Sequence, residues 1–298
     1  MAVNKVEYNE NGQLKTLIDL TADTVTADKL AKGYTAHDMS GNIITGTMES
    51  GSGDNTLLKS VIEGSVTELT IPDGTTKIIS NIFRENQKLK KVVIPGTVKE
   101  IGDYAFYASQ NLKYVNLPYG INKIGNFAFF HTNLGYNSDL TYGQGKIVIP
   151  DSVYEIGSGA FSYNDNIQYI TLPNNDNFNA VPPSCFEWCS NLETIKIPNS
   201  VTTIKDSAFY GCNDLKTIYI GSGVTTIEVY AFDTAINISP LTGVYLSPTT
   251  PPTISSNSFN FDNTTNCKIY VPTGTLNAYK TAENWSTYAN RMIEWNPK

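Results

Sequence analysis

A short aliphatic–proline pair that returns at near-regular intervals is the feature that most constrains how this chain can fold. The spacings between successive pairs are 23, 23, 32, 23 and 25 residues. The pairs are Ile71-Pro72, Ile94-Pro95, Leu117-Pro118, Ile149-Pro150, Leu172-Pro173 and Ile197-Pro198, with Ile220-Gly221 standing in the same register. Self-similarity at such a period is the signature of a solenoid, in which each repeat forms one turn.

A phenylalanine accompanies each pair. It stands eleven residues after most of the prolines or the equivalent glycine, at Phe83, Phe106, Phe129, Phe161, Phe209 and Phe232. Phe186 lags by two positions, and Phe259 belongs to a degenerate eighth turn. In most turns the residue before the phenylalanine is small, usually alanine. We therefore expect the chain to pack tightly at the alanine and the phenylalanine to fill the axis of the coil.

Each unit also indicates its own local structure. Val92 and Ile94 are separated by one residue, as are their counterparts in other units, and this alternation is typical of a strand. Proline then ends the strand because it has no N–H to donate to a sheet. The stretch Ile-x-x-x-Ala-Phe that follows has near-helical spacing, so it predicts a short helical or irregular return segment.

A unit of 23 residues cannot bury its own apolar face, so neighbouring units must stack to form a continuous core. The sequence predicts a right-handed coil over residues 57–265, with one parallel β-sheet to which each turn contributes one strand. The 32-residue spacing is explained by an insertion at residues 135–143. Long loops of this kind are tolerated because the entropic cost of loop closure grows slowly with length.

The pattern Leu-x-x-Val-x-Ile-Pro-x-x-Val-x-x-Ile-x-x-x-Ala-Phe-x-x-Cys resembles the BspA-type leucine-rich repeat family over about residues 57–295. Cys189 and Cys212 occupy its terminal cysteine position, and other turns carry Asn86, Ser109, Thr132 and Asn164 there. Residues 266–298 are similar to the closing segment of that family and predict a C-terminal cap. The resemblance implies a leucine-rich-repeat solenoid that serves surface adhesion or ligand binding and has no catalytic activity.

Residues 1–48 lie outside the repeat. The sequence predicts strands at residues 3–8 and 14–20, a short helix at 29–32, and a hairpin turning at Ser40-Gly41-Asn42. Residues 49–56 read as a Gly/Ser linker. We therefore expect a small N-terminal α+β segment that serves either for attachment or as a cap.

Three strings in this segment are similar to the N-terminal segments of phage and prophage tail proteins. They are residues 17–21, residues 33–38 and residues 44–47. About fifty residues form only a marginal core by themselves, so we expect the segment to pack against a partner. That partner is the first solenoid turn, a second copy of the segment, or a tail protein.

Charge and hydropathy exclude several function classes. The 298 residues carry a formal net charge of −7, and the only arginines are Arg84 and Arg291. Phosphate contacts need clustered Lys and Arg, so neither nucleic acid nor an anionic membrane surface is expected as the partner. No apolar run is long enough to span a bilayer, and no secretion signal is visible at residues 1–5. We expect an extracellular or virion-associated protein without membrane insertion.

No catalytic or cofactor-binding motif appears, so we expect neither enzyme activity nor a cofactor. His37 beside Asp38 could form a base and its orienting group, but neighbours in a strand point to opposite faces. His131 follows Phe129-Phe130 in a predicted turn, where a packing role is expected. A turn or surface role is the expectation for His37.

No metal is expected either. Cys189 and Cys212 should stack on adjacent turns, and Cys185 is the only further ligand nearby. Buried free thiols are the expectation, with a Cys189–Cys212 disulfide and a zinc site as alternatives. Residues 174–177 offer oxygen ligands for calcium but lack the alternating acidic spacing of a calcium loop, so a plain turn is predicted.

The strand alternation predicts which side chains leave the core and form the exposed face of the sheet. The whole chain contains 18 tyrosines, and a tyrosine on this face offers contact area and a hydroxyl at low entropic cost. The candidate ligand-binding residues are Lys91, Tyr114, Asn116, Lys146, Tyr169, Thr171, Lys196, Tyr219, Tyr245 and Tyr270. The competing interpretation is that these are β-forming residues at exposed strand positions.

The sequence therefore predicts a receptor-binding or adhesive module that recognises a glycan or a protein on a cell surface. A phage or prophage tail is the setting that the N-terminal segment favours. A bacterial surface or secreted adhesin is the alternative, and a glycan-active enzyme is the third.

Overall fold

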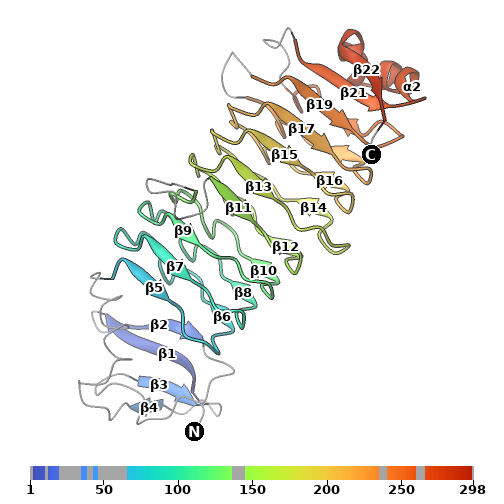
Figure 1. Cartoon of the computed structure of the whole chain (residues 1–298). Helices are drawn as coiled ribbons and strands as arrows, with labels where there is room; N and C mark the ends of the chain where they lie inside the picture. Colours follow the sequence, from blue (N-terminus) through green and yellow to red (C-terminus); the bar gives the residue numbers. More distant parts are fainter. Residues whose placement is uncertain are drawn as a thin grey trace.

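The computed structural model is a solenoid whose turns stack from the N-terminal to the C-terminal end (Figure 1). It describes residues 66–135, 145–234, 240–259 and 266–296, together with the backbone of four strands between residues 3 and 45. Each complete turn of the described part contains a first strand, a tight bend, a second strand and a return segment. The predicted parallel-sheet solenoid of leucine-rich-repeat type is confirmed.

The first strands form two parallel sheets in line. One contains β5 (Glu68–Thr70), β7 (Lys91–Val93) and β9 (Tyr114–Val115). The other contains β11 (Lys146–Val148), β13 (Tyr169–Thr171), β15 (Thr194–Lys196), β17 (Thr217–Ile220), β19 (Gly243–Leu246), β21 (Lys268–Pro272) and β22 (Met292–Trp295). The break between β9 and β11 coincides with the 32-residue spacing.

A second strand of two residues follows in each turn, so the prediction of one strand per turn was wrong. One group contains β6 (Lys77–Ile78), β8 (Glu100–Ile101), β10 (Lys123–Ile124) and β12 (Glu155–Ile156). The other contains β14 (Ala180–Val181), β16 (Thr203–Ile204), β18 (Thr226–Ile227) and β20 (Thr253–Ile254). Two residues are too few to show a period of two, which is why the pattern escaped sequence analysis.

The return segments are built from turns, and in the described repeats they contain no helix. Their backbone N–H groups donate to the next turn of the coil: Phe106 N reaches Ala128 O at 2.8 Å, and Phe209 N reaches Ala231 O at 2.8 Å. An α-helix would need these donors for carbonyls four residues back in the chain. The near-helical spacing of Ile and Phe therefore marks a corner of the coil, where both side chains point inward, and not a helix.

The predicted phenylalanine axis is confirmed as one unbroken stack. Ring centroids of successive members lie 5.1–5.6 Å apart. Phe106 and Phe161 are completely buried, as the register required. The stack contains Phe83, Phe106, Phe129, Phe161, Phe186, Phe209, Phe232 and Phe259, and is called the inner column below.

The family's terminal cysteine position supplies an internal hydrogen bond. Ser109 Oγ donates to Phe83 O at 2.6 Å, and Cys189 Sγ and Cys212 Sγ donate to Phe161 O and Phe186 O, each at 3.3 Å. A serine hydroxyl and a cysteine thiol thus make the same bond, so the residue can vary between these turns. All four cysteines are free and buried, and burial raises the pKa of Cys189 to about 12. The buried-thiol interpretation is confirmed.

The N-terminal strands are antiparallel. They are β1 (Val3–Glu10), β2 (Gln13–Asp19), β3 (Thr35–Asp38) and β4 (Ile43–Thr45), with β1 pairing to β2 and β3, and β3 to β4. The two predicted strands are confirmed, as is the antiparallel pairing expected of the hairpin, whose turn at Ser40-Gly41-Asn42 lies outside the described residues. β2 also pairs with β6 through Asp19 and Lys77, so these strands continue the sheet of second strands. The predicted helix at residues 29–32 and the linker at 49–56 lie outside the described residues.

At the other end, α2 (Leu276–Thr281), the 3₁₀-helix η2 (Trp285–Arg291) and β22 cover the last turn (Figure 1). Trp285 and Tyr279 are completely buried. Trp285 Nε1 donates to Pro252 O and the Tyr279 hydroxyl donates to Pro248 O, both at 2.7 Å. The Trp285 ring lies 5.8 Å from that of Phe259 and so ends the inner column. No helix in the described part of the chain is long and apolar enough to cross a membrane.

Candidate functional site

The exposed face of the first strands carries the residues that the sequence nominated. In β11 and β13 an exposed residue stands on each side of a buried one, Ile147 and Ile170. In parallel register, residues at equivalent positions line up as columns across the sheet. The predicted alternation is therefore confirmed, and the outward columns are those that were expected.

The N-terminal part of this face is engaged in structural contacts. Lys91 Nζ pairs with Glu68 Oε2 at 3.4 Å. The Asn116 amide accepts from Ile94 N at 2.6 Å and donates to Ile94 O at 2.8 Å. It thereby takes the place of a strand backbone where β9 ends after two residues. Tyr114 lies half-buried on β9.

The middle of the face is more open. Lys146, Tyr169 and Thr171 are exposed on β11 and β13. The Tyr169 hydroxyl lies 3.4 Å from Glu193 Oε2, which Lys216 Nζ also approaches at 3.1 Å. These groups form a polar surface in which the charges are partly compensated.

The aromatic side chains gather at the C-terminal part. The rings of Tyr219 and Tyr245 stack at 4.8 Å, and those of Tyr245 and Tyr270 at 4.2 Å with only 3° between their planes. Trp295 meets Tyr245 edge to face at 5.1 Å. These four residues are called the aromatic platform. Tyr114 and Tyr169, which the sequence nominated for the same ligand-binding face, lie in another column, and Tyr114 is also in the other sheet.

Two residues of this site escaped sequence analysis. Trp295 lies on β22, beyond the last repeat, and its indole Nε1 donates to Leu246 O at 3.0 Å. Gly243 leaves room for the neighbouring ring, because a Cβ there would lie 2.9 Å from Tyr245 Cε2. A glycine at an outward strand position was the available signal, since it marks the close approach of another group.

The hydroxyl at the centre of the platform stays protonated. Burial is the main cause that raises the pKa of Tyr245, and the hydrogen bond with Tyr270 and the neighbouring tyrosines raise it further. The platform therefore presents stacked apolar rings edged with neutral hydroxyl groups. Such a surface can contact both the apolar and the hydroxyl-bearing parts of a ligand.

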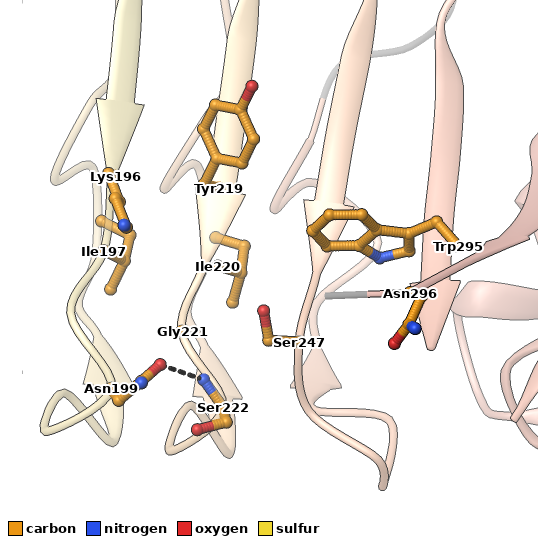
Figure 2. A pocket seen from close by; sticks show the side chains of 10 residues that line it. All are labelled: Lys196, Ile197, Asn199, Tyr219, Ile220, Gly221, Ser222, Ser247, Trp295 and Asn296. Atoms are coloured by element: carbon orange, nitrogen blue, oxygen red, sulfur yellow. Dashed lines mark hydrogen bonds between the residues drawn. The ribbon is translucent and has the colours of Figure 1, made fainter. Parts of the chain in front are cut away.

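A hollow of about 660 Å³ lies beside the platform, within the range of small-molecule sites. Figure 2 shows Tyr219 and Lys196 on neighbouring strands and Trp295 on the far side of Ser247. Its lining is Lys196, Ile197, Asn199, Tyr219, Ile220, Gly221, Ser222, Ser247, Trp295 and Asn296. It thus combines apolar surface, amides, hydroxyls and one ammonium group.

The backbone around the hollow is tightly fitted. Ser222 N donates to Asn199 Oδ1 at 2.9 Å, the bond drawn in Figure 2. Gly221 stands where other turns have proline, and a Cβ at this position would collide with the carbonyl of Pro198. Glycine is therefore required here, because the two turns approach each other closely.

The other sequence candidates have structural roles. His131 packs with its ring 6.1 Å from those of Phe130 and Tyr163, which confirms the packing interpretation. Asn175 Oδ1 accepts from Phe178 N at 3.0 Å, so residues 174–177 form the predicted turn. The His37 side chain lies outside the described residues. Within the described ranges, no three His, Cys, Asp or Glu residues come together as a metal site.

Comparison with known proteins identifies the repeat. The model of the BspA type leucine rich repeat region matches in six copies, over residues 62–144 and 136–267. No curated protein matches the chain. Among solved structures, a leucine-rich repeat protein from Bacteroides ovatus matches with a TM-score of 0.57 and 21% identity, covering 92% of this chain and 66% of the other.

Two further structures match less closely. A leucine rich cell surface protein from Faecalibacterium prausnitzii has a TM-score of 0.41 and 23% identity, with 63% of this chain and 62% of the other covered. The leucine-rich repeat protein of T. pallidum has a TM-score of 0.38 and 19% identity, with coverage of 60% and 68%. The chain thus spans somewhat less than two thirds of the first two relatives. At these identities the likeness concerns the fold.

Proposed function

Because this chain belongs to the BspA-type leucine-rich repeat family, we propose that it is a binding protein without enzymatic activity. Its ligand is a glycan or a protein on a cell surface. The binding region is the C-terminal part of the first-strand face, where the aromatic platform borders the hollow.

The observation that carries this proposal is the stacking of Tyr219, Tyr245 and Tyr270 beside a hollow with polar rims. Tyr219 keeps 36% of its surface exposed. The fold does not require an aromatic residue on this face of the sheet. Equivalent positions on earlier strands hold Thr171 and Lys196. Clustered tyrosine and tryptophan are characteristic of protein recognition surfaces, where a few such residues supply most of the binding energy.

A glycan fits the chemistry of the hollow best. Amide and hydroxyl groups of Asn199, Ser222 and Asn296 can exchange hydrogen bonds with sugar hydroxyls. The edges of Tyr219 and Trp295 supply apolar contact for the ring carbons. Lys196 adds a cation at the margin, which would favour a sugar bearing an acidic group.

The setting that we propose is attachment to a phage or prophage tail, in an extracellular or virion-associated location. It is supported by the resemblance of residues 17–21, 33–38 and 44–47 to tail-protein N-termini. The alternative is a bacterial surface or secreted adhesin with the same binding face. Tail and baseplate genes beside the coding sequence would support the first setting, and sorting or secretion genes the second.

Deleting residues 1–50 tests the role of the N-terminal segment. As an attachment module, its loss leaves residues 57–298 soluble and able to bind ligand, while assembly with a partner is lost. As a cap, its loss exposes the edge of β6, which pairs with β2, and the fragment aggregates. Aggregation of the fragment would contradict the attachment proposal.

A glycan array and a whole-cell binding screen test the proposed function. The full chain should bind one class of glycan or cell, and Tyr219→Ser should weaken that binding about tenfold, as expected for a central aromatic contact. Tyr154→Ser is the matched control, because Tyr154 is an exposed tyrosine next to β12 and away from the first strands. Equal loss in both variants, or release of product from the bound glycan, would contradict the proposal.

A further inference from the structure

A second set of aromatic side chains follows the return segments, outside the inner column. Successive rings are in contact: Tyr107 and Phe130 at 4.8 Å, Phe130 and Tyr163 at 5.1 Å, Tyr163 and Trp188 at 6.1 Å, Trp188 and Tyr210 at 5.7 Å, and Tyr210 and Tyr230 at 6.2 Å. These six residues are called the return ladder. They occupy three different positions relative to the phenylalanine of each turn, so no single repeat position reveals them.

The backbone beneath several of these rings is in the left-handed region. Tyr163, Trp188 and Tyr230 have φ angles of 59°, 55° and 55°. The equivalent positions of other turns adopt the same conformation, both where they hold glycine, as at Gly211 and Gly159, and where they hold another residue, as at Glu85, Ala108 and Ser184. A bulky residue in this region costs about 1–2 kcal/mol relative to its usual conformation. The coil would accept glycine here.

Two of these three residues are substantially exposed, and Trp188 is half-buried. Tyr163 and Tyr230 each keep 40% of their surface accessible. Burial in the core therefore does not account for the choice of an aromatic side chain at Tyr163 and Tyr230. The left-handed backbone recurs at the corners of other turns, so it is a property of the coil, and the aromatic rings are what distinguish these turns.

The chain itself shows which group this surface accepts. The guanidinium carbon of Arg84 lies 4.8 Å from the ring centroid of Tyr107, at the first rung of the ladder. Arg84 Nε also contacts Glu85 Oε1 at 3.2 Å. A guanidinium is thus held between an aromatic face and a carboxylate, the arrangement in which cation–π attraction and a charge-assisted hydrogen bond act together.

The middle of the ladder offers the same two groups to an external cation. Glu187 precedes Trp188, and its carboxylate adds to the effect of burial in raising the pKa of Tyr163. None of the ion pairs among the described residues involves Glu187. The whole chain is acidic, with a formal net charge of −7, which favours the approach of a basic partner.

We propose that the return ladder around Tyr163, Glu187 and Trp188 binds an arginine-bearing segment of a partner protein. An arginine of that segment lies on the ladder as Arg84 lies on Tyr107, and its guanidinium donates to the Glu187 carboxylate. This site is separate from the aromatic platform and does not depend on the function proposed for it. The remaining rungs extend the contact along the coil axis.

The test is titration of the full chain with a hexa-arginine peptide, followed by fluorescence anisotropy of a labelled peptide. Trp188→Gly should weaken binding about tenfold, since glycine suits the left-handed backbone while removing the ring. Glu187→Gln should weaken it several-fold. Tyr154→Ser, at an exposed tyrosine next to β12, is the control and should bind the peptide as the unchanged protein does. Melting temperatures verify that all variants are folded.

Two comparisons separate stacking from simple charge attraction. A hexa-lysine peptide has the same charge but no planar guanidinium, so it should bind several-fold more weakly. Equal affinity for both peptides, or unchanged affinity after Trp188→Gly, would overturn the proposal. Binding of a neutral oligosaccharide that is lost in Trp188→Gly, with no peptide binding, would instead make the return ladder a glycan site.

Discussion

The inner column and the aromatic platform are both stacks of rings along the coil, yet they obey different rules. Their spacings are similar, 5.1–5.6 Å inside and 4.2–4.8 Å for the tyrosines outside, because both follow the separation of neighbouring strands. The inner column extends from Phe83 to Phe259, whereas the tyrosines of the platform lie only on β17, β19 and β21. The coil therefore needs the inner rings in turn after turn, and it does not need the outer ones.

The largest expected effect tests the inner column. Phe106→Ala should reduce the free energy of unfolding by about 3–5 kcal/mol, because it opens a cavity between Phe83 and Phe129. Chemical denaturation measures the change. A loss below about 1 kcal/mol would show that the column does not carry the stability of the coil.

The polar position next to the inner column should come second. Asn164 is completely buried, and its Nδ2 donates to Phe129 O at 2.7 Å and to Phe161 O at 2.9 Å. Asn164→Ala should cost about 1–3 kcal/mol because these carbonyls lose a buried donor. Cys189→Ser is a suitable control in denaturant unfolding, since a serine already makes the equivalent bond at Ser109. If the two variants unfold alike, the donor at this position is not what stabilises the coil.

A smaller change in stability is expected from Gly243→Val. Its Cβ would approach Tyr245 Cε2 at 2.9 Å and force the ring away from its position over the sheet. We expect a loss of about 1 kcal/mol or less, because the ring is near the surface and valine favours a strand. Ligand affinity should fall much more strongly than stability. Binding that persists unchanged would show that the flat arrangement of the rings is not needed.

The smallest effect concerns charge on the second strands. Lys123 Nζ lies 2.7 Å from Glu155 Oε1, and this hydrogen bond is the main cause that raises the pKa of Lys123 above 10.5. A raised folded-state pKa stabilises the fold below the unfolded value, and the contribution disappears as pH rises through the folded one. Because both side chains are substantially exposed, solvent screening limits it to a few tenths of a kcal/mol.

The difference in unfolding free energy between the unchanged protein and Lys123→Met measures this contribution. It should be present at neutral pH and vanish above the folded-state pKa of Lys123. A difference that grows with rising pH would have the wrong sign for this ion pair.

Sequence alone predicted the parts of the fold in which one position is repeated in many turns. The first strands, the inner column and the exposed columns with Tyr219, Tyr245 and Tyr270 all follow from regular spacing. The second strands were missed because two residues cannot display alternation. The Ile-x-x-x-Ala-Phe spacing of the return segments was interpreted as helical. The hydrogen bonds that actually hold these segments join different turns of the coil, and the sequence of one segment does not reveal them.

The residues of the site could be predicted only where they occupy a position that recurs from one repeat to the next. Trp295 joins the platform from a strand beyond the last repeat, and the return ladder uses three repeat positions. Asn116 was nominated for ligand binding, but its amide is occupied by the backbone of Ile94. A lone sequence cannot reveal such a contact, because it depends on where the neighbouring strand ends.

The most direct test of the difference between the two stacks is to measure unfolding free energy and ligand affinity together for Tyr219→Ser. The ligand is the glycan or cell type found in the screen, and Phe106→Ala provides the reference for stability. We predict a stability loss of no more than about 1 kcal/mol, the size of one surface ring contact, and an affinity about tenfold lower. A stability loss as large as that of Phe106→Ala, with affinity unchanged, would contradict the account.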